Sequence, residues 1–429
     1  MGTTIANYRF IAWTLLFLVT SISSKAQSPA IKKISLNEMQ QLFVKNNYQL
    51  IAARFQVDQA KADIITAKLF DNPELSYENI LYNPETKKFL ETSLASGQYQ
   101  GALSQMIKLA GKRNKNIQLA VTGSKMAEYQ YFDLMRTLRF DLNSSFYKAY
   151  FLQQSAKVYA QQVSSLTLLV NTSEKQLQAG NIASKDLIRI KSLLYGIKAE
   201  YTAVQNNLED LQTTLKLLTN IPASTELEFA VPPEEPLNGE IKQQTISNLL
   251  DSARLNRADL RWSEADLQYA KDNLRVQKAN AIPDLEISLT YDLQGSYIQK
   301  YTGLGLKLPI PLFNRNQGEV KKAKIAIEAG SNALMRQESI LENEVYNTFN
   351  SAVRAEELYD GVDKNFHNDF EKMTVEVIKN FRSRNLSLIE FLDFYDSFKT
   401  NTLQMNDILF DRMNAREELN FVTGSNIFK

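Results

Sequence analysis

The sequence predicts a mainly α-helical fold with a small β part, in which one unit of helix, strand and long helix occurs twice. Sliding the chain against itself by about 210 residues aligns Pro73-Glu74-Leu75 with Pro283-Asp284-Leu285. A shift of about 202 to 204 residues aligns Gly101 with Gly303 and Asp186-Leu187 with Glu390-Phe391. Within each unit, proline-free tracts indicate long helices, and a two-residue alternation indicates strands.

The first 26 residues have the features of a secretory signal peptide. Arg9 precedes an apolar run from Phe10 to Val19, and the small-residue site Ser24-Lys25-Ala26 follows it. A single membrane anchor is the alternative, but the run is shorter than the roughly 20 residues that a span needs. After residues 1–26 we expect a first repeat at 27–220, a proline-rich connector at 221–245 and a second repeat at 246–429.

The first repeat is expected to open with short helices and to contain long helices at 112–177 and 185–219. The second repeat should contain their counterparts at 318–380 and 387–423. No proline lies between Pro84 and Pro222 or after Pro311, so long helices meet no break there. Apolar residues at three-four spacing also predict a coiled-coil seam along the second helix. The seam consists of Leu187, Ile190, Leu194, Ile197, Tyr201, Val204, Leu208, Leu211, Leu215 and Leu218. In the second repeat, Asn401 and Arg412 interrupt this pattern.

Four strands are expected, at 74–82, 99–107, 284–294 and 302–308, forming two hairpins. Leu285, Ile287 and Leu289 alternate with Glu286 and Ser288, which gives one apolar and one polar face. Such a face can lie against lipid, but open strand edges in hydrocarbon leave backbone groups unpaired, so the sheet must close. Three copies would provide a twelve-stranded barrel with an open lumen, whereas two would provide a filled one. The polar face expected to line this lumen carries Glu74, Glu78, Glu286, Asp292 and Lys307, which favours cations.

Two motifs sit where a strand must turn into a long helix: Gly111-Lys112-Arg113, and the segment from Pro309 to Gly318 that reads PIPLFNRNQG. With the duplication, the hairpins and the connector, they make the mature chain resemble the TolC-like outer-membrane efflux channels, and its heavy-metal branch in particular. The resemblance implies a homotrimer with a twelve-stranded β-barrel in the outer membrane of a Gram-negative bacterium and a periplasmic α-helical barrel. It further implies outer-membrane lipid, a periplasmic adaptor protein and an inner-membrane RND-type pump as partners, with heavy-metal cations as the exported substrates.

The resemblance also assigns roles to the helical turns at the periplasmic end. The adaptor-docking candidates are Gly180, Asn181, Ile182, Ala183, Ser184, Asn385, Leu386 and Ser387. Ser184 and Ser387 are the expected N-caps of the helices that follow these turns. The candidates for a periplasmic gate are Asp369, Glu371, Glu376, Arg382 and Arg384, where the arginines are expected either to pair with the carboxylates or to leave them as a solvated surface.

Other classes of function have little support in the composition. The 49 basic and 48 acidic residues nearly cancel, so no net charge points to nucleic acid. With no cysteine and one histidine, His367, the chain offers no transition-metal cluster. A catalytic triad could form only through His367, which is expected instead to be a partly exposed residue on a helix face, so we expect no enzyme activity, metal site or cofactor. Two alternatives stay open: a multidrug or organic-solute channel of the same fold, and a periplasmic coiled-coil structural protein.

Overall fold

The computed structural model describes residues 31–230, 240–295, 298–363, 372–373, 376–381, 383 and 385–428. The expected signal peptide and residues 231–239 of the expected connector lie outside these ranges. The chain forms two compact units, one from residues 1–45 and 148–234 and a larger one from 46–147 and 235–429. Helix α4 (Lys112–Gln178) contributes residues to both units.

The smaller unit packs a helical hairpin against a two-stranded sheet. The second part of α4 and helix α5 (Ser184–Thr219) form the hairpin, and all ten residues of the expected α5 seam are buried or half-buried. Strand β1 (Ile31–Ser35), which precedes helix α2 (Leu36–Asn46), pairs in parallel with β6 (Glu226–Ala230). Two glutamine side chains from the hairpin bind β6: Gln153 exchanges two hydrogen bonds with Phe229, and Gln212 exchanges two with Leu227. These amides substitute for a neighbouring strand.

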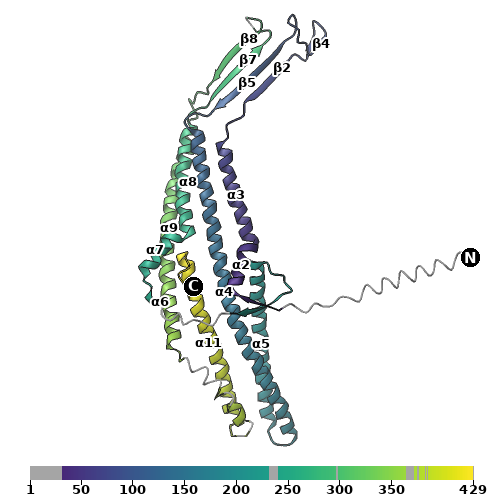
Figure 1. Cartoon of the computed structure of the whole chain (residues 1–429), viewed down its shortest axis with the longest axis vertical. Helices are drawn as coiled ribbons and strands as arrows, with labels where there is room; N and C mark the ends of the chain where they lie inside the picture. Colours follow the sequence, from purple (N-terminus) through teal and green to yellow (C-terminus); the bar gives the residue numbers. More distant parts are fainter. Residues whose placement is uncertain are drawn as a thin grey trace, which may run out of the picture. The chain divides into compact units, whose positions relative to one another are not determined.

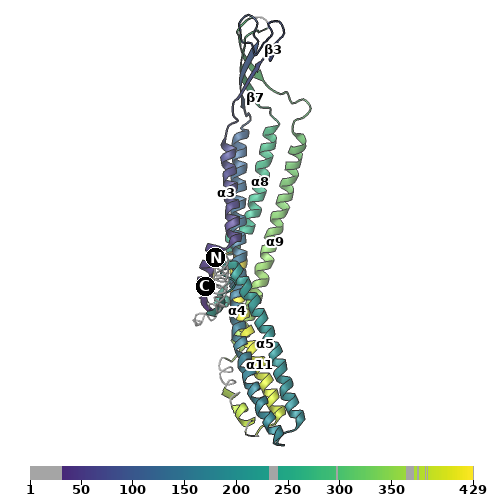
Figure 2. The same cartoon turned by 90° about the vertical axis from the view of Figure 1, so that its right-hand side faces the viewer.

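The larger unit combines helices with a four-stranded sheet (Figure 1, Figure 2). Besides the first part of α4, its described helices include α3 (Tyr48–Lys68), α6 (Glu240–Gln243), α7 (Ile246–Asn256), α8 (Ala258–Asn280), α9 (Gln317–Gly361) and α11 (Leu388–Thr423). The sheet contains β2 (Glu74–Asn79), β5 (Tyr99–Ile107), β7 (Leu285–Asp292) and β8 (Tyr301–Lys307) in the order β2-β5-β7-β8, all antiparallel. A small ladder joins β3 (Tyr82–Asn83) to β4 (Lys88–Phe89).

The duplication is visible in matching elements of the two repeats. Helices α2 and α7 have 11 residues each, and α5 and α11 have 36 each. Each repeat then carries one hairpin of the sheet, β2-β5 or β7-β8, as expected. Among the helices in the described part of the chain, none has an 18-residue stretch apolar enough to cross a bilayer.

Most expected elements differ from the structure by at most two residues at either end, but two differ by more. The strand expected at 74–82 ends at Asn79, and the chain enters the loop that holds β3 and β4. The single helix expected over 318–380 is interrupted, because α9 ends at Gly361 and the backbone of Val362 is extended. Glycine and β-branched valine are poor helix formers, and their local preference prevails at this point.

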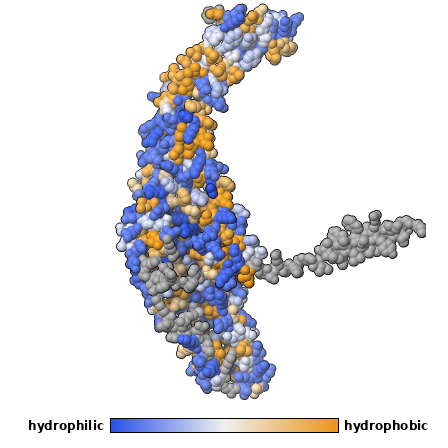
Figure 3. Space-filling view, in the orientation of Figure 1, coloured by the Kyte–Doolittle hydropathy of each residue, from blue (hydrophilic) through white to orange (hydrophobic). Residues whose placement is uncertain are grey.

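The outer surface of the larger unit is apolar where its sheet joins its helices (Figure 3). Phe70 follows α3, while Ile310 and Phe313 lie between β8 and α9, and all three side chains are exposed. A group of exposed large apolar side chains is typical of a face that contacts lipid or another protein. The hydrophobic core of the unit lies elsewhere, among α6, α7, α8, α9 and α11, with Leu249, Leu341, Val345 and Leu419 at its centre.

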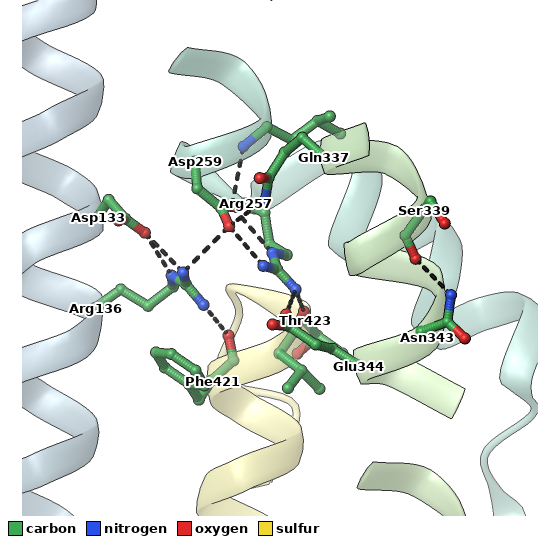
Figure 4. A network of polar contacts seen from close by, with 12 residues as sticks. Asp133, Arg136, Arg257, Asp259, Gln337, Ser339, Asn343, Glu344, Phe421 and Thr423 are labelled. Carbon is green, nitrogen blue, oxygen red and sulfur yellow. Dashed lines mark hydrogen bonds and ion pairs between the residues drawn. The ribbon is translucent and has the colours of Figure 1, made fainter. Parts of the chain in front are cut away.

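One polar network joins four helices of the larger unit (Figure 4). The buried guanidinium of Arg257, just before α8, binds Asp259 at 2.5 Å and Glu344 of α9 at 2.6 Å. It also donates to the carbonyl oxygen of Val422 in α11. Arg136 of α4 lies 3.6 Å from Asp259 and donates to the carbonyl oxygen of Phe421. Burial opposes the charge of Asp259, but the hydrogen bond and charge of Arg257 outweigh it and lower the pKa of this carboxyl.

A second buried ion pair fixes α11 against α9. Arg412, which interrupts the apolar pattern in the sequence, is 2% exposed and binds the fully buried Glu356 through two hydrogen bonds of 2.9 and 3.0 Å. Its guanidinium carbon lies 3.8 Å from the centre of the Tyr359 ring. The buried charge of Arg412 is therefore paired with that of Glu356, so α11 stays packed against α9 at this position although Arg412 interrupts its apolar pattern.

Replacing Glu356 by leucine should destabilise the larger unit by about 3–5 kcal/mol, because it removes the carboxylate that binds the buried guanidinium of Arg412 through two hydrogen bonds. The double variant Glu356→Leu, Arg412→Met should recover most of this loss, since it removes both charges. Thermal unfolding followed by circular dichroism compares the three proteins. A double variant as unstable as the single one would contradict this account.

Replacing Gly424 by alanine should cost at least about 1–2 kcal/mol, because its φ of 66° is a left-handed conformation that L-residues avoid. A Cβ there would also lie 3.0 Å from the backbone nitrogen of Arg257. The matched control is Gly196→Ala in the interior of α5, where a Cβ meets nothing within 4 Å. That change should instead stabilise by about 0.5–1 kcal/mol. Equal melting temperatures for both variants would refute the argument.

Candidate functional site

The five residues expected to line a lumen lie on one face of the sheet. Paired residues in an antiparallel ladder share a face, and the register pairs Glu78 with Gln100, which pairs with Asp292. Glu74 lies four residues before Glu78 and Glu286 six before Asp292, so the two-residue period puts them on that same face. Lys307 pairs directly with Glu286. The sheet thus gathers all five side chains as one polar face.

The basic residue of this face has an acidic partner. The Nζ of Lys307 lies 3.0 Å from Oε2 of Glu286. Glu74, Glu78 and Asp292 lie in other rows of the ladder, and Asp292 accepts a hydrogen bond from the backbone N–H of Gln294. Three of the four carboxylates therefore lie outside the local neutralisation by Lys307, and the face carries a net formal charge of about −3, from four acids and one base.

The opposite face of the sheet is apolar from edge to edge. Leu75, Leu103, Leu289 and Leu304 are successive partners in one row across the four strands. Each of these leucines is exposed, and Leu75 is 80% exposed. Three tyrosines follow toward the loop end, with ring centroids 6.2 Å apart for Tyr77 and Tyr99 and 6.0 Å apart for Tyr99 and Tyr291. A leucine row beside a tyrosine group is typical of a surface facing hydrocarbon near its interface with water.

The motif Gly111-Lys112-Arg113 binds the end of β5 to both repeats. Lys112 is buried, and its Nζ lies 2.7 Å from the carboxylate of Asp284, which also accepts a hydrogen bond from the backbone N–H of Leu109. Arg113 donates to the carbonyl oxygen of Lys68 at the end of α3, and its guanidinium lies over the ring of Phe70. The motif positions the start of α4 beneath the sheet.

The second motif, from Pro309 to Gly318, leads from β8 into α9. The side-chain amide of Asn316, which has a left-handed backbone and precedes α9, donates to the carbonyl oxygen and side-chain oxygen of Gln277 in α8. Arg315 and Gln317 are linked through the backbone N–H of Arg315 and the side-chain oxygen of Gln317. As in the first repeat, the motif ties a helix start to the preceding helix, so its structural role is to turn a strand into a helix.

The two expected helical turns have the same backbone hydrogen bond. Asn181 N–H donates to the carbonyl oxygen of Gln176, and Asn385 N–H donates to that of Asn380, five residues back in both cases. In the first turn, Gly180, Asn181, Ala183 and Ser184 are exposed and Ile182 is half-buried; in the second, Asn385 and Ser387 are exposed and Leu386 is half-buried. Each turn thus presents polar groups around one partly covered aliphatic side chain.

The capping of the following helices differs between the turns. Ser387 is the N-cap of α11, and it forms a reciprocal capping box with Glu390. The expectation for Ser184 is wrong: Ala183 occupies the N-cap position of α5 without a side-chain hydrogen bond, and Ser184 is the first helical residue. The start of α5 therefore has no N-cap side chain that accepts a backbone hydrogen bond, unlike the start of α11.

Most of the expected gate residues lie outside the described residues. These are Asp369, Glu371, Arg382 and Arg384, and His367 lies outside as well. Glu376 is described, is exposed, and lies 3.7 Å from Lys379 one helical turn away. Neither role proposed for the arginines from the sequence is tested by this contact.

Sequence reasoning missed two features of the site. The ion pair of Lys112 with Asp284 joins residues 172 positions apart, and only the alignment of Pro283-Asp284-Leu285 with the first repeat marked that segment. The loop between β2 and β5 holds a buried carboxylate, Glu91, amid hydroxyl side chains. The only available sign was its run of threonine and serine, which ordinary loops share.

Comparison with known proteins agrees with this geometry. The model of the family described as "Outer membrane efflux protein" matches residues 40–220 and 249–359. Cobalt-zinc-cadmium resistance protein CzcC of Cupriavidus metallidurans is 23% identical over 291 residues, which cover 68% of this chain and 66% of that protein. The chain thus spans slightly less than two thirds of this relative's length.

Solved structures share the fold at low sequence identity. A membrane protein from Pseudomonas aeruginosa has a TM-score of 0.73 at 15% identity, covering 91% of this chain and 92% of that one. The CmeC outer membrane channel of Campylobacter jejuni has a TM-score of 0.71 at 15% identity, covering 91% and 86%. These likenesses confirm the expected fold class. Since the family model matches more than half of its residues, the chain belongs to the outer membrane efflux protein family and, as expected, is an outer-membrane protein.

Proposed function

We propose that three copies of this chain close their sheets into a twelve-stranded barrel that serves as a passive exit duct. The observation that carries the proposal is the division of the sheet into an acidic face and a leucine face, with β2 and β8 each paired on one side only among the described strands. In hydrocarbon, the free backbone groups of these two edges need partners. Pairing β2 of one copy with β8 of the next supplies them and directs the polar face inward.

The long helices would continue this duct into the periplasm. Helices α3, α4, α8 and α9 adjoin the sheet, and the turns that contain Asn181 and Asn385 each lie before a long helix, α5 or α11. These turns are proposed to contact a periplasmic adaptor, which would connect the duct to an inner-membrane RND-type pump. Membership of an outer-membrane family excludes the alternative of a periplasmic coiled-coil scaffold.

Heavy-metal cations are the proposed substrates. The similarity to the cobalt-zinc-cadmium resistance protein supports this class, and so does the net negative charge of the proposed lumen. Carboxylates along a lumen raise the local concentration of cations without holding them tightly. Residues Asp369, Glu371, Glu376, Arg382 and Arg384 are proposed to form the gate at the periplasmic end, on the basis of the sequence alone.

The proposed lumen predicts cation preference in single-channel recordings under a salt gradient. Replacing Glu78 by glutamine and Asp292 by asparagine should move the reversal potential toward zero, since it removes two of the three net charges per copy. The matched control is Glu286→Gln with Lys307→Met, which removes an ion pair and leaves the net charge unchanged. The control should keep the preference of the unmodified channel.

Anion preference in the unmodified protein would contradict the proposed lumen. An equal shift for both double variants would show that charge on this face does not determine selectivity.

Deleting the gene should sensitise cells to zinc, cobalt, cadmium, copper or silver and leave their resistance to detergents and antibiotics unchanged. Growth on graded concentrations of each compound, with and without the gene restored on a plasmid, measures this. Restoring the Glu78→Gln, Asp292→Asn variant should rescue growth less well than the control variant. Sensitisation only to organic compounds would instead assign the chain to multidrug or organic-solute efflux.

A further inference from the structure

The loop between β2 and β5, residues 80–98, is a folded structure rather than a plain connection. Strands β3 and β4 pair within it, and Leu90 N–H donates to the carbonyl oxygen of Leu81. At its base, Ile80 N–H donates to the carbonyl oxygen of Gln98. It also contacts the turn between β7 and β8, where the side chain of Gln294 donates to the carbonyl oxygen of Leu94.

A buried carboxylate organises this loop. Glu91 accepts hydrogen bonds from the hydroxyl groups of Thr86, Ser93 and Ser96 and from the side-chain amide of Asn83. The hydroxyl groups of Thr86 and Ser96, despite some opposing desolvation, lower the pKa of this carboxyl. Asn83 in turn accepts from the backbone N–H groups of two following residues. Four neutral donors thus stabilise one charge, which fixes the course of the chain.

The loop is closely packed at Gly97, where the chain leads back to β5. A Cβ built on Gly97 would lie 2.6 Å from the carbonyl oxygen of Glu91 and 2.6 Å from the backbone nitrogen of Ser93. No larger residue fits there without moving backbone. A prefolded loop loses little conformational entropy when it binds, which favours its use as a contact surface.

The outside of the same loop carries a group of large apolar side chains. Leu81, Phe89, Leu90 and Leu94 are exposed, with Phe89 at 71%. The ring of Phe89 lies 5.0 Å from that of Tyr82, so the ladder presents a paired aromatic surface. Four large apolar side chains are thus exposed close together, beside exposed charged residues such as Lys87 and Lys88. Apolar side chains gathered in this way on a surface are typical of a contact with another protein.

The loop reaches over an edge of the sheet that has no partner within the described chain. Strand β2 pairs only with β5, and the loop begins directly after β2. In Figure 1, β4 lies beyond β2 on the side away from β5. A strand from a second copy that pairs with β2 would therefore run beneath this apolar surface.

We propose that the loop at 80–98 is a clasp that covers the residues just before β8 of the neighbouring copy and locks the sheets of two copies together. The inference rests on the closure of the sheet proposed above, in which β8 of the next copy pairs with β2. Ile298 lies just before that β8 and is exposed in the single chain. Phe89 and Leu90 of one copy then cover Ile298 of the next.

The absence of native cysteine allows a direct test by cross-linking. The variants Phe89→Cys and Ile298→Cys are produced together in one cell with different affinity tags, so a link between the two tags joins two copies. A short bis-maleimide is applied to intact outer membranes. We expect a mixed-tag dimer in denaturing gels. The matched control replaces Phe89→Cys by Phe55→Cys on α3, which is similarly exposed and lies on the helical part, and should give no mixed-tag link.

The outcomes separate this inference from the proposed function. Heat-modifiable trimers that conduct ions but give no mixed-tag link would overturn the clasp and leave the duct intact. Links between two copies of Phe89→Cys alone would also overturn it, because they would show that the loops meet one another instead of the residues just before β8. Failure of the unmodified chain to form trimers or conduct would refute the proposed duct, and the clasp with it.

A second measurement avoids cross-linking. Phe89→Ser with Leu90→Ser should lower the temperature at which trimers dissociate in detergent, since it removes the apolar cover and leaves the Glu91 network in place. Gly97→Ala should lower it as well, through the backbone clash at the return of the loop. An unchanged dissociation temperature for both variants would overturn the proposal.

Discussion

The helices of the larger unit depend on one buried cation. Arg257 reaches a carboxylate in its own helix, another in α9 and a carbonyl oxygen in α11, and Asp259 extends the contact to Arg136 in α4. Burying a guanidinium costs free energy unless each of its donors is hydrogen-bonded, so Arg257 can be buried only when the helices that carry its partners are all packed around it. The apolar core among α6, α7, α8, α9 and α11 supplies the buried apolar surface, whereas the polar network determines which turn of one helix lies beside which turn of the next.

The two copies of the duplicated unit make different contacts in the structure. Each repeat contributes one hairpin to the sheet and one helical hairpin with the same five-residue hydrogen bond at its turn. The corners before α3 and α8, however, have diverged. In the first repeat Asn47 caps α3 with its side chain, and in the second Arg257 occupies the equivalent place and makes inter-helix contacts instead. Repetition explains the architecture, and this substitution explains why the second repeat holds the larger unit together.

Local patterns in the sequence predicted most elements, because periodicity and proline spacing depend on near neighbours. The strand expected at 99–107 has those bounds, and the helix expected at 112–177 extends one residue further. The sequence also placed all five lumen candidates on one face, since a two-residue period is enough for that. Sequence patterns did not predict contacts between residues that lie far apart in the sequence. The pairing of Arg412 with Glu356, or of Lys112 with Asp284, leaves no local trace, and neither does the fold of the loop around Glu91.

The parallel pairing of β1 with β6 bears on the order in which the chain is built. Strand β1 lies near the amino end, yet its partner comes about 195 residues later and is itself held by glutamines of α4 and α5. Contacts so distant in sequence form late, because the intervening chain must be ordered first. The earlier of the two strands is thus fixed in place late, and until then its backbone groups stay bonded to water instead of to β6.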